Sequence, residues 1–382
     1  MIVREESEMK TVAVIYLGRR GGGPVYAYEM TKGLIENGYH VYAFVSDGVE
    51  NIEQWRALRT VATEEISTYH SEASFVFNSI AFRMHRLRKL RKKYKDVHVD
   101  ACYVPMGHTW SAYIWNIFKD AQLIYTIHDP IDHSTNRPIY RSLMKMGEKI
   151  MKMGIKEKKP DDIIILSKTF KEYVCQKYQM SEEHVHVLPH GVFDFYQKLE
   201  GGKTFTYATD KVNFVFFGRI CAYKGLDVLA EAFRCVKQER PDVALTIVGS
   251  GDFSFYAPYY RDLCDVTVVN EWIPDEDVAG FFKSEAKLIL VLPYVDATQS
   301  GVIPIAMSCG VPVIASNTGG LSEQVDHEVT GLLCAPGDAK DLARCMLQLA
   351  ASDNTGMIEK ARNFIATLGW DVLSAELGRL VK

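Results

Sequence analysis

The feature that most constrains this chain is the alternation of short apolar runs with longer helical patterns. The runs are five to seven residues long and rich in β-branched side chains; they lie at 11–17, 40–46, 101–105, 123–129, 163–167, 184–189, 212–218, 243–249, 266–272, 287–293 and 311–316. Near-continuous apolar strands separated by helices are typical of parallel sheets covered on both faces. Because the runs fall into two series, they predict two doubly wound α/β domains.

The length of the chain agrees with that division. Its 382 residues, 47% of them hydrophobic, are too many for one ordinary core and enough for two. The polar, glycine-bearing stretch "YQKLEGGKTFTYATDK" (196–211) separates the two series and is the predicted linker. We therefore expect an N-terminal domain at 1–200, a C-terminal domain at 201–356, and a C-terminal helix at 357–382 that can pack back on the N-terminal domain.

Composition excludes several classes of protein. The net charge is −4 with 24% charged residues, which is an ordinary globular value and not a nucleic-acid-binding one. No run approaches the roughly 18 apolar residues of a membrane span, and the N-terminus "MIVREESEMK" is too charged for a signal peptide. The eight cysteines are scattered without a C-x-x-C pair, as in proteins of reducing compartments. These observations predict a cytoplasmic protein with no nucleic-acid partner.

One segment is strongly basic. "RMHRLRKLRKKYK" (83–95) combines many cations with apolar Met84, Leu87 and Leu90 at helical spacing. Such a helix can rest on anionic lipid, which would allow peripheral contact with the inner face of a membrane. The alternative is a solvated basic face.

Ligands of open parallel sheets bind at the carboxyl ends of the strands, so the loops there are the candidate sites. After the first strand comes "GRRGGGPVYAYEM", in which Gly22 and Gly23 free backbone N–H groups for an anion. The dinucleotide fingerprint G-x-G-x-x-G is not completed, because Tyr26 occupies the third glycine position. A plain flexible turn is the alternative.

The loop "FGRICAYKGLDVL" of the second half brings cations to a strand end. Arg219 follows Gly218 directly, and Lys224 immediately precedes a helix. Two cations beside a helix N-terminus suit a diphosphate, and Lys224 is expected to be solvent-exposed. Two solvated surface charges are the alternative. The next strand ends at Gly249 in another small turn, "VGSGD".

The loop "PYVDATQSGVIPIAMSCG" offers donors without a cation. Thr298, Gln299, Ser300 and Gly301 precede a helix, and their hydroxyls, amide and N–H groups can hold phosphate oxygens. Tight packing of small residues is the alternative.

His128 and a D-x-D pair are the remaining candidates. His128 ends the strand "LIYTIHD" and can act as a general acid or base, bind a sugar hydroxyl, or be structural. Asp275 and Asp277 could hold a metal–diphosphate, but their place at a helix start predicts capping. We therefore predict no metal site and no cofactor.

Taken together, the motifs resemble family 4 glycosyltransferases, which have the GT-B fold. The resemblance rests on "FGRICAYKGLDVLAEAF", "LTIVGSGD", "SCGVPVIASNTGGLSEQV" and "TGLLCAPGD", with weaker support from the first glycine-rich loop, "IHD" and "LPHGV". It covers nearly the whole chain and is specific in combination.

The resemblance implies a fold, a reaction and roles for residues. The fold is two Rossmann-like domains facing a central cleft, and the reaction is metal-independent, retaining transfer of a hexose from a UDP- or GDP-linked sugar to a saccharide or lipid-linked acceptor. Arg219 and Lys224 would bind the donor diphosphate, and His128 would meet the transferred sugar. Donor contacts would come from Gly22, Gly23, Gly218, Gly249, Thr298, Gln299, Ser300, Gly301, Val302 and Glu323.

The chain departs from the family at two glutamates. Family members commonly carry two glutamates that bracket seven residues, and the alignment places Ala297 and Ile305 there. Asp296, Thr298 or Gln299 would have to take over their contacts. The departure leaves a second hypothesis, a catalytically weak member that binds a nucleotide-sugar or a partner subunit. A different GT-B enzyme, such as an epimerase or a phosphorylase, is a third. The sequence does not name the base, the sugar, the acceptor, the linkage or the oligomeric state.

Overall fold

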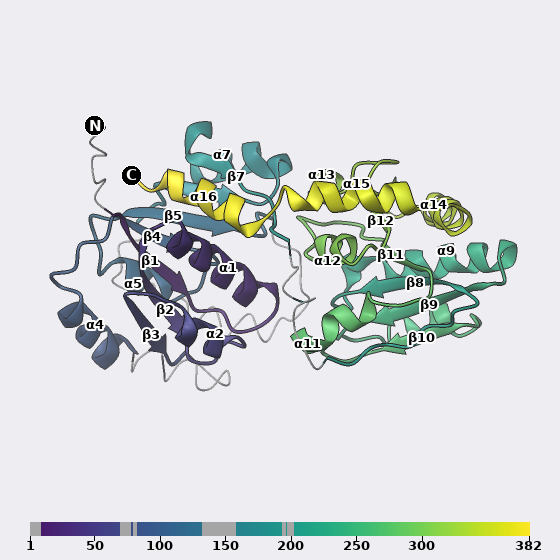
Figure 1. The fold of residues 1–382 in the computed structure, drawn as a ribbon, viewed down its shortest axis with the longest axis horizontal. Helices are drawn as coiled ribbons and strands as arrows, with labels where there is room; N and C mark the ends of the chain where they lie inside the picture. The colour runs from purple at the N-terminus through teal and green to yellow at the C-terminus, as the bar shows by residue number, and fades with distance from the viewer. Residues whose placement is uncertain (1–8, 69–77, 79–81, 132–157, 193–195, 197–201) are drawn as a thin grey trace, which may run out of the picture. The chain divides into compact units, whose positions relative to one another are not determined.

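The computed structural model describes residues 9–68, 78, 82–131, 158–192, 196 and 202–382, which form two compact units (Figure 1). Unit 1 comprises Met1–Leu166, Phe170–Pro189 and Trp370–Lys382. Unit 2 comprises Ser167–Thr169 and His190–Gly369. Each unit is therefore completed by a segment that is distant in the sequence.

Unit 1 is built on a seven-stranded sheet in which every neighbouring pair is parallel, in the order β3-β2-β1-β4-β5-β6-β7. The strands are β1 Thr11–Tyr16, β2 His40–Ser46, β3 Ala62–Ile66, β4 Ala101–Val104, β5 Gln122–Ile127, β6 Asp162–Ile165 and β7 Val185–Val187. Its helices are α1 Gly22–Glu36, α2 Ile52–Ala57, α4 Leu87–Lys93, α5 Ser111–Trp115, α7 Lys171–Tyr178 and α16 Trp370–Leu380. The strand order reverses between β1 and β4, which is where doubly wound sheets open a crevice for ligands.

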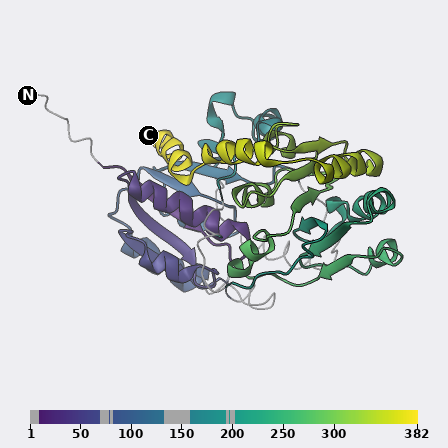
Figure 2. The same cartoon turned by 45° about the vertical axis from the view of Figure 1, so that its right-hand side comes forward.

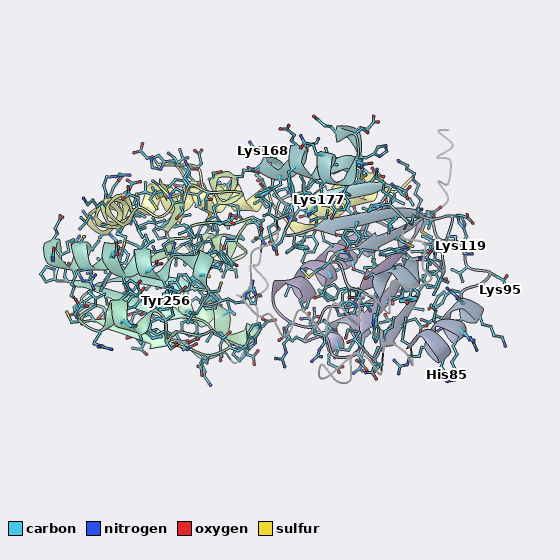
Figure 3. The ribbon with its side chains drawn as sticks, turned by 180° about the vertical axis from the view of Figure 1, so that it is seen from behind. His85, Lys95, Lys119, Lys168, Lys177 and Tyr256 are labelled. Carbon is cyan, nitrogen blue, oxygen red and sulfur yellow. The ribbon has the colours of Figure 1, made fainter. Side chains whose placement is uncertain are left out.

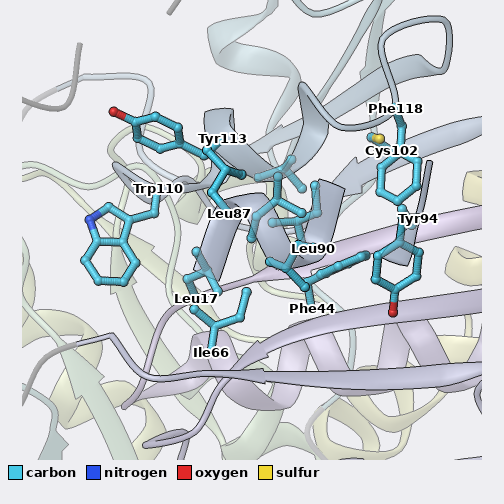
Figure 4. Close-up of a cluster of buried hydrophobic side chains, with 14 of the residues drawn as sticks. Leu17, Phe44, Ile66, Leu87, Leu90, Tyr94, Cys102, Trp110, Tyr113 and Phe118 are labelled. Atoms are coloured by element: carbon cyan, nitrogen blue, oxygen red, sulfur yellow. The ribbon is translucent and has the colours of Figure 1, made fainter. Parts of the chain in front are cut away.

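The basic helix α4 packs its apolar side into the core of unit 1 (Figure 4). Leu87 is 3% and Leu90 8% exposed, in a cluster that also holds the stacked rings of Phe82 and Trp110. These two leucines are therefore not available to a lipid surface, because the core of the unit takes up the apolar side of the helix. The side chain of Met84 lies outside the described residues.

Unit 2 repeats the architecture with six parallel strands in the order β10-β9-β8-β11-β12-β13. The strands are β8 Val212–Phe217, β9 Val243–Val248, β10 Val266–Val269, β11 Leu288–Leu292, β12 Val313–Ser316 and β13 Leu332–Cys334. Its helices are α9 Leu226–Glu239, α10 Ala257–Tyr260, α11 Asp275–Val278, α12 Val302–Ser308, α13 Leu321–Gln324, α14 Ala339–Ala351 and α15 Thr355–Ala366. Here the order reverses between β8 and β11, so the loops after these two strands share the crevice.

The C-terminal segment forms two helices, where the sequence predicted one. Helix α15 packs against α12 in unit 2, whereas α16 lies beside α1 in unit 1 (Figures 1 and 2). Gly33 permits this approach, because a Cβ there would lie 2.1 Å from Ser374 Oγ. The Tyr39 hydroxyl also donates to the Gly378 carbonyl over 2.7 Å. Of the predicted linker 196–211, residues 197–201 lie outside the described residues.

Candidate functional site

The loops after β8 and β11 are joined into one edge of unit 2. The two strands are neighbours in the sheet, and the Val295 N–H donates to the Tyr223 carbonyl over 2.9 Å. Gly225, with φ of 65°, lies so close to the second loop that a Cβ would stand 2.0 Å from the Pro293 carbonyl oxygen. A glycine is therefore required where the two loops meet.

Lys224 lies between two tyrosine rings. Its Nζ is 3.5 Å from the centroid of Tyr294, which follows β11, and 4.9 Å from that of Tyr223. Lys224 is 9% exposed, so the prediction of a solvent-exposed cation is wrong. The sequence could not show this, because the covering ring comes from a loop some seventy residues away.

Arg219 and Lys224 both lie close enough to Cys221 to affect the pKa of its thiol. Burial raises the pKa of Cys221, although the nearby charges of Lys224 and Arg219 lower it. The Arg219 side chain is exposed, in contrast to that of Lys224. The loop after β8 thus holds one fixed cation and one solvent-facing cation close to Cys221.

The side chain of Gln324 hydrogen-bonds to the backbone of the loop Thr298–Gly301 at Ser300. Its Oε1 accepts from the Ser300 N–H over 2.8 Å, and its Nε2 donates to the Ser300 carbonyl over 3.0 Å. The Val302 N–H donates to Ser300 Oγ over 3.4 Å, so two of the N–H groups expected to meet phosphate have protein partners. The helix that follows, α12, has only seven residues.

Gln299 is partly exposed, although its side-chain oxygen is buried. Thr298 and Ser300 on either side are each 4% exposed, whereas Gln299 is partly exposed. Its Oε1 atom has no hydrogen-bond partner among the described residues. An amide oxygen in this position can accept a hydrogen bond from a hydroxyl group.

The positions aligned with the family glutamates are buried. Ala297 is 1% and Ile305 5% exposed, and Ile305 belongs to the helix that packs against α15. These residues fill space inside unit 2.

The carboxylate of Glu323 accepts hydrogen bonds from other residues of the protein. Its Oε1 accepts from Ser167 Oγ and from the N–H and hydroxyl of Thr169, and its Oε2 accepts from the Lys168 N–H. Although burial acts to raise its pKa, these hydrogen bonds hold the pKa of Glu323 below its ordinary value. Glu323 thereby fastens the segment Ser167–Thr169 to unit 2 (Lys168 is labelled in Figure 3).

Gly218 and Gly249 directly follow neighbouring strands, and both have backbone angles that favour glycine. Their φ angles are 142° and 143°, and a Cβ on Gly249 would stand 1.8 Å from the Gly218 carbonyl oxygen. A larger residue at position 249 would force the ends of β8 and β9 apart, whereas a Cβ on Gly218 would come no closer than 3.8 Å to the Tyr294 hydroxyl oxygen, so only its positive φ favours glycine there.

The glycine-rich loop of unit 1 begins α1 at Gly22. The preceding Gly21 has φ of 83° and provides no side-chain cap. A Cβ on Gly23 would lie 2.7 Å from the Tyr16 hydroxyl oxygen, so Gly23 makes room for that ring, while Gly22 is exposed. Backbone N–H groups at the start of a 15-residue helix favour an anion.

His128 is held beside α1 in the same unit. Its Nε2 lies 2.8 Å from the Pro105 carbonyl, and its ring meets that of Tyr26 edge-on at 4.7 Å. Burial lowers the pKa of His128, so the imidazole is neutral near pH 7 with its proton on Nε2. Nδ1 then carries no proton and can accept a hydrogen bond, which suits a sugar hydroxyl better than acid catalysis.

Three residues of these surroundings were missed at the sequence level: Tyr294, Gln324 and Tyr26. Only Tyr294 carried a usable signal, because it comes two residues after a strand of the crevice. Over the described part of the chain, no group of three or more His, Cys, Asp or Glu side chains could hold a metal ion.

Comparison with known proteins identifies the class. Structures that match nearly the whole chain include a glycosyltransferase from Rickettsia africae (TM-score 0.67, 18% identity, 98% of each chain). Anabaena HepE in complex with UDP-glucose also matches (TM-score 0.65, 16% identity, 97% of this chain and 99% of that one). The protein therefore has the GT-B fold, as predicted.

The family follows from the sequence matches. The model "Glycosyltransferase Family 4" matches residues 20–193, and "Glycosyl transferases group 1" matches residues 211–352. The uncharacterized glycosyltransferase MJ1607 of Methanocaldococcus jannaschii is 25% identical, over 85% of this chain and 83% of its own. AmsK of Erwinia amylovora, an amylovoran biosynthesis glycosyltransferase, is 33% identical over 35% of each chain. The chain belongs to the family 4-like glycosyltransferases.

Proposed function

We propose that the protein transfers a hexose from a UDP- or GDP-linked sugar to a saccharide or lipid-linked acceptor, with retention of anomeric configuration, in polysaccharide or glycoconjugate synthesis. The observation that carries this proposal is the shared edge of unit 2, where Lys224, Arg219 and the Thr298–Gly301 loop lie at the ends of β8 and β11. HepE was solved with UDP-glucose, and AmsK acts in amylovoran biosynthesis. Both names support a nucleotide-sugar donor and a saccharide product.

In the proposed reaction the bond between the anomeric carbon and the diphosphate oxygen breaks, and the acceptor oxygen bonds to the same face. The acceptor proton passes to the departing diphosphate oxygen. Lys224 and Arg219 stabilise the negative charge that builds on the leaving group. His128 Nδ1 accepts a hydrogen bond from the sugar, and the N–H groups at Gly22 and Gly23 favour the anionic donor.

We assign the contacts of the absent glutamates in part to Gln299. This residue is partly exposed, and its buried Oε1 is an acceptor with no hydrogen-bond partner among the described residues. Its amide oxygen can accept from a ribose or sugar hydroxyl as a carboxylate would, without adding a negative charge beside the diphosphate.

A second candidate is a family member that binds a nucleotide-sugar without efficient turnover. Burial of Ala297 and Ile305 favours it, because neither position can hold the ribose or the sugar. Incubation with UDP- and GDP-linked hexoses, with and without saccharide acceptors, separates the two functions. Release of nucleoside diphosphate supports transfer, and tight binding without release supports the second candidate. If no donor binds and no nucleoside diphosphate is released, both candidate functions are contradicted.

Cys221 provides a direct probe of the proposed diphosphate site. Because this thiol lies under the charges of Arg219 and Lys224, bound nucleoside diphosphate should slow its alkylation severalfold. Maleimide labelling with peptide mass mapping measures this rate. The exposed Cys235 and Cys264 serve as internal controls and should react at unchanged rates. Equal protection of all three thiols, or of none, would show that the nucleoside diphosphate does not bind at this loop.

We expect turnover to be independent of divalent metal. Two cations already face the leaving group, so chelation with EDTA should change the initial rate less than twofold. Nucleoside diphosphate release before and after addition of EDTA is the measurement. Loss of most activity, restored by Mg²⁺ or Mn²⁺, would show that Lys224 and Arg219 are insufficient.

The exposed face of α4 suits peripheral contact with anionic lipid, even though its leucines are buried. Arg88, Lys89, Arg91 and Lys92 are exposed, and among the described residues no acid lies within ion-pair range of them (His85 and Lys95 in Figure 3 flank the helix). No described helix has both the length and the apolarity to cross a bilayer. Contact with lipid would therefore be electrostatic and would require low salt.

Liposome flotation tests this contact. At low salt we expect recovery with vesicles that contain anionic lipid and little with neutral vesicles. Changing Arg88, Lys89, Arg91 and Lys92 to Gln should abolish recovery. The matched control changes four exposed cations of unit 2, Arg261, Lys283, Lys340 and Lys360, and should float normally. Equal recovery with both vesicle types would leave α4 as a solvated face.

A further inference from the structure

The ammonium group of Lys224 occupies the corner between two aromatic walls. Its Nζ lies 3.5 Å from the Tyr294 centroid and 4.9 Å from the Tyr223 centroid, and the two centroids are 6.2 Å apart. These three lengths form a nearly right-angled triangle, so the rings cover two adjacent sides of the charge. At 3.5 Å over the ring face, Tyr294 makes the closer contact.

Both rings are fixed by the backbone around them. Tyr294 is fully buried, and the Val295 N–H next to it donates to the carbonyl of Tyr223. Gly225, next to Lys224, closes against the carbonyl of Pro293, next to Tyr294. These backbone contacts between the two loops thereby fix the position of the Lys224 ammonium group relative to both rings.

An aromatic ring differs from a carboxylate as a partner for a functional lysine. The ring face attracts the cation through its quadrupole without neutralising it, so the positive charge stays available to an anion. Burial raises the pKa of Tyr294, so its side chain is a neutral phenol at physiological pH and contributes its ring face and no negative charge.

We propose that Tyr294 is a positioning residue for the transfer reaction, whose ring face holds the Lys224 ammonium where the leaving diphosphate develops its charge. The proposal rests on the proposed function and adds a residue to it. A fixed, partly desolvated cation stabilises charge more strongly than a mobile one, because no reorganisation is needed as the bond breaks.

Fluorination of the Tyr294 ring distinguishes a cation–π role from a packing role. Replacing Tyr294 with Phe keeps the ring face, and kcat should stay within about threefold of the native value. Introducing 4-fluoro-, 3,5-difluoro- and 3,4,5-trifluorophenylalanine at this position weakens the quadrupole stepwise with little change in shape. We expect kcat to fall with each fluorine, to about one-tenth for the trifluoro ring, as loss of a desolvated cation–π contact implies. The KM for the donor should move less.

The same series in a Lys224→Met background is the control and should be flat, because the cation is gone. Transfer by the native protein with a flat fluorination series would overturn the role of Tyr294 while leaving the proposed function intact. No transfer with any donor would overturn the proposed function and this role with it. A slope that persists in the Lys224→Met background would assign the effect to packing, and so also overturn the role.

Discussion

Replacing Lys224 with Ala should lower kcat by about 10²–10³, the loss typical when one preorganised stabilising group is removed from a transition state. Negative charge builds on the leaving diphosphate as the sugar departs, so Lys224 contributes more to the transition state than to the bound donor. Stopped assays of nucleoside diphosphate release with saturating donor measure this. Near-normal turnover in Lys224→Ala would contradict the diphosphate assignment.

The burial of Lys224 adds a stability effect that needs its own control. Truncating Lys224 to Ala should cost on the order of 1–2 kcal/mol of unfolding free energy, since both the cation–π contact and the packing of the aliphatic stem against the rings are lost. Lys224→Met keeps the stem and removes the charge, so it should lose as much kcat and less stability. Lys237→Ala is the matched control: Lys237 is largely buried and paired with Asp265 on the same unit. It should lose stability while keeping kcat.

Replacing Ile305 with Ala should have the opposite profile, a large loss of stability with little direct effect on donor affinity. Ile305 is 5% exposed on a helix packed against α15, and truncating a buried isoleucine costs about 2–5 kcal/mol. Urea unfolding followed by circular dichroism measures the loss. Ile303→Ala, 1% exposed on the same helix, is the matched control and should lose a similar amount.

Gln299→Ala completes the comparison. Its side chain is partly exposed, so unfolding should be unchanged, while donor affinity should fall about fivefold to tenfold through loss of one hydrogen bond. Titration of both variants with nucleotide-sugar decides between them. If Ile305→Ala unfolds normally but loses donor binding, position 305 contacts the nucleotide despite its burial, and the reassignment to Gln299 is wrong.

The pattern of apolar runs was sufficient to predict two parallel sheets, because a strand buried on both faces must be apolar along its whole length. Two strands escaped that rule. β3 pairs only with β2 and carries Glu64 and Glu65, and β13 is three residues long and pairs only with β12. β3 is only partly buried, so its sequence need not be apolar, whereas β13 is apolar but too short to stand out as a run.

The candidate loops could also be read from sequence, since parallel topology brings the carboxyl ends of strands to one edge. What each side chain does there was decided by tertiary packing. Tyr294 covers Lys224, the carboxylate of Glu323 is taken by Ser167–Thr169, and the sheet buries Leu87 and Leu90 of α4.

The difference between what the sequence predicts and what tertiary packing decides has a physical cause. Periodicity reports the burial of residues within one helix or strand, and the sequence by itself determined those elements and the edge at which their loops meet. Whether a cation is covered by a ring, or a carboxylate is free to bind a ligand, depends on atoms that are distant in the chain. Tyr294 and Lys224 meet only because β8 and β11 are neighbours in the folded sheet, and only the tertiary structure decided that contact.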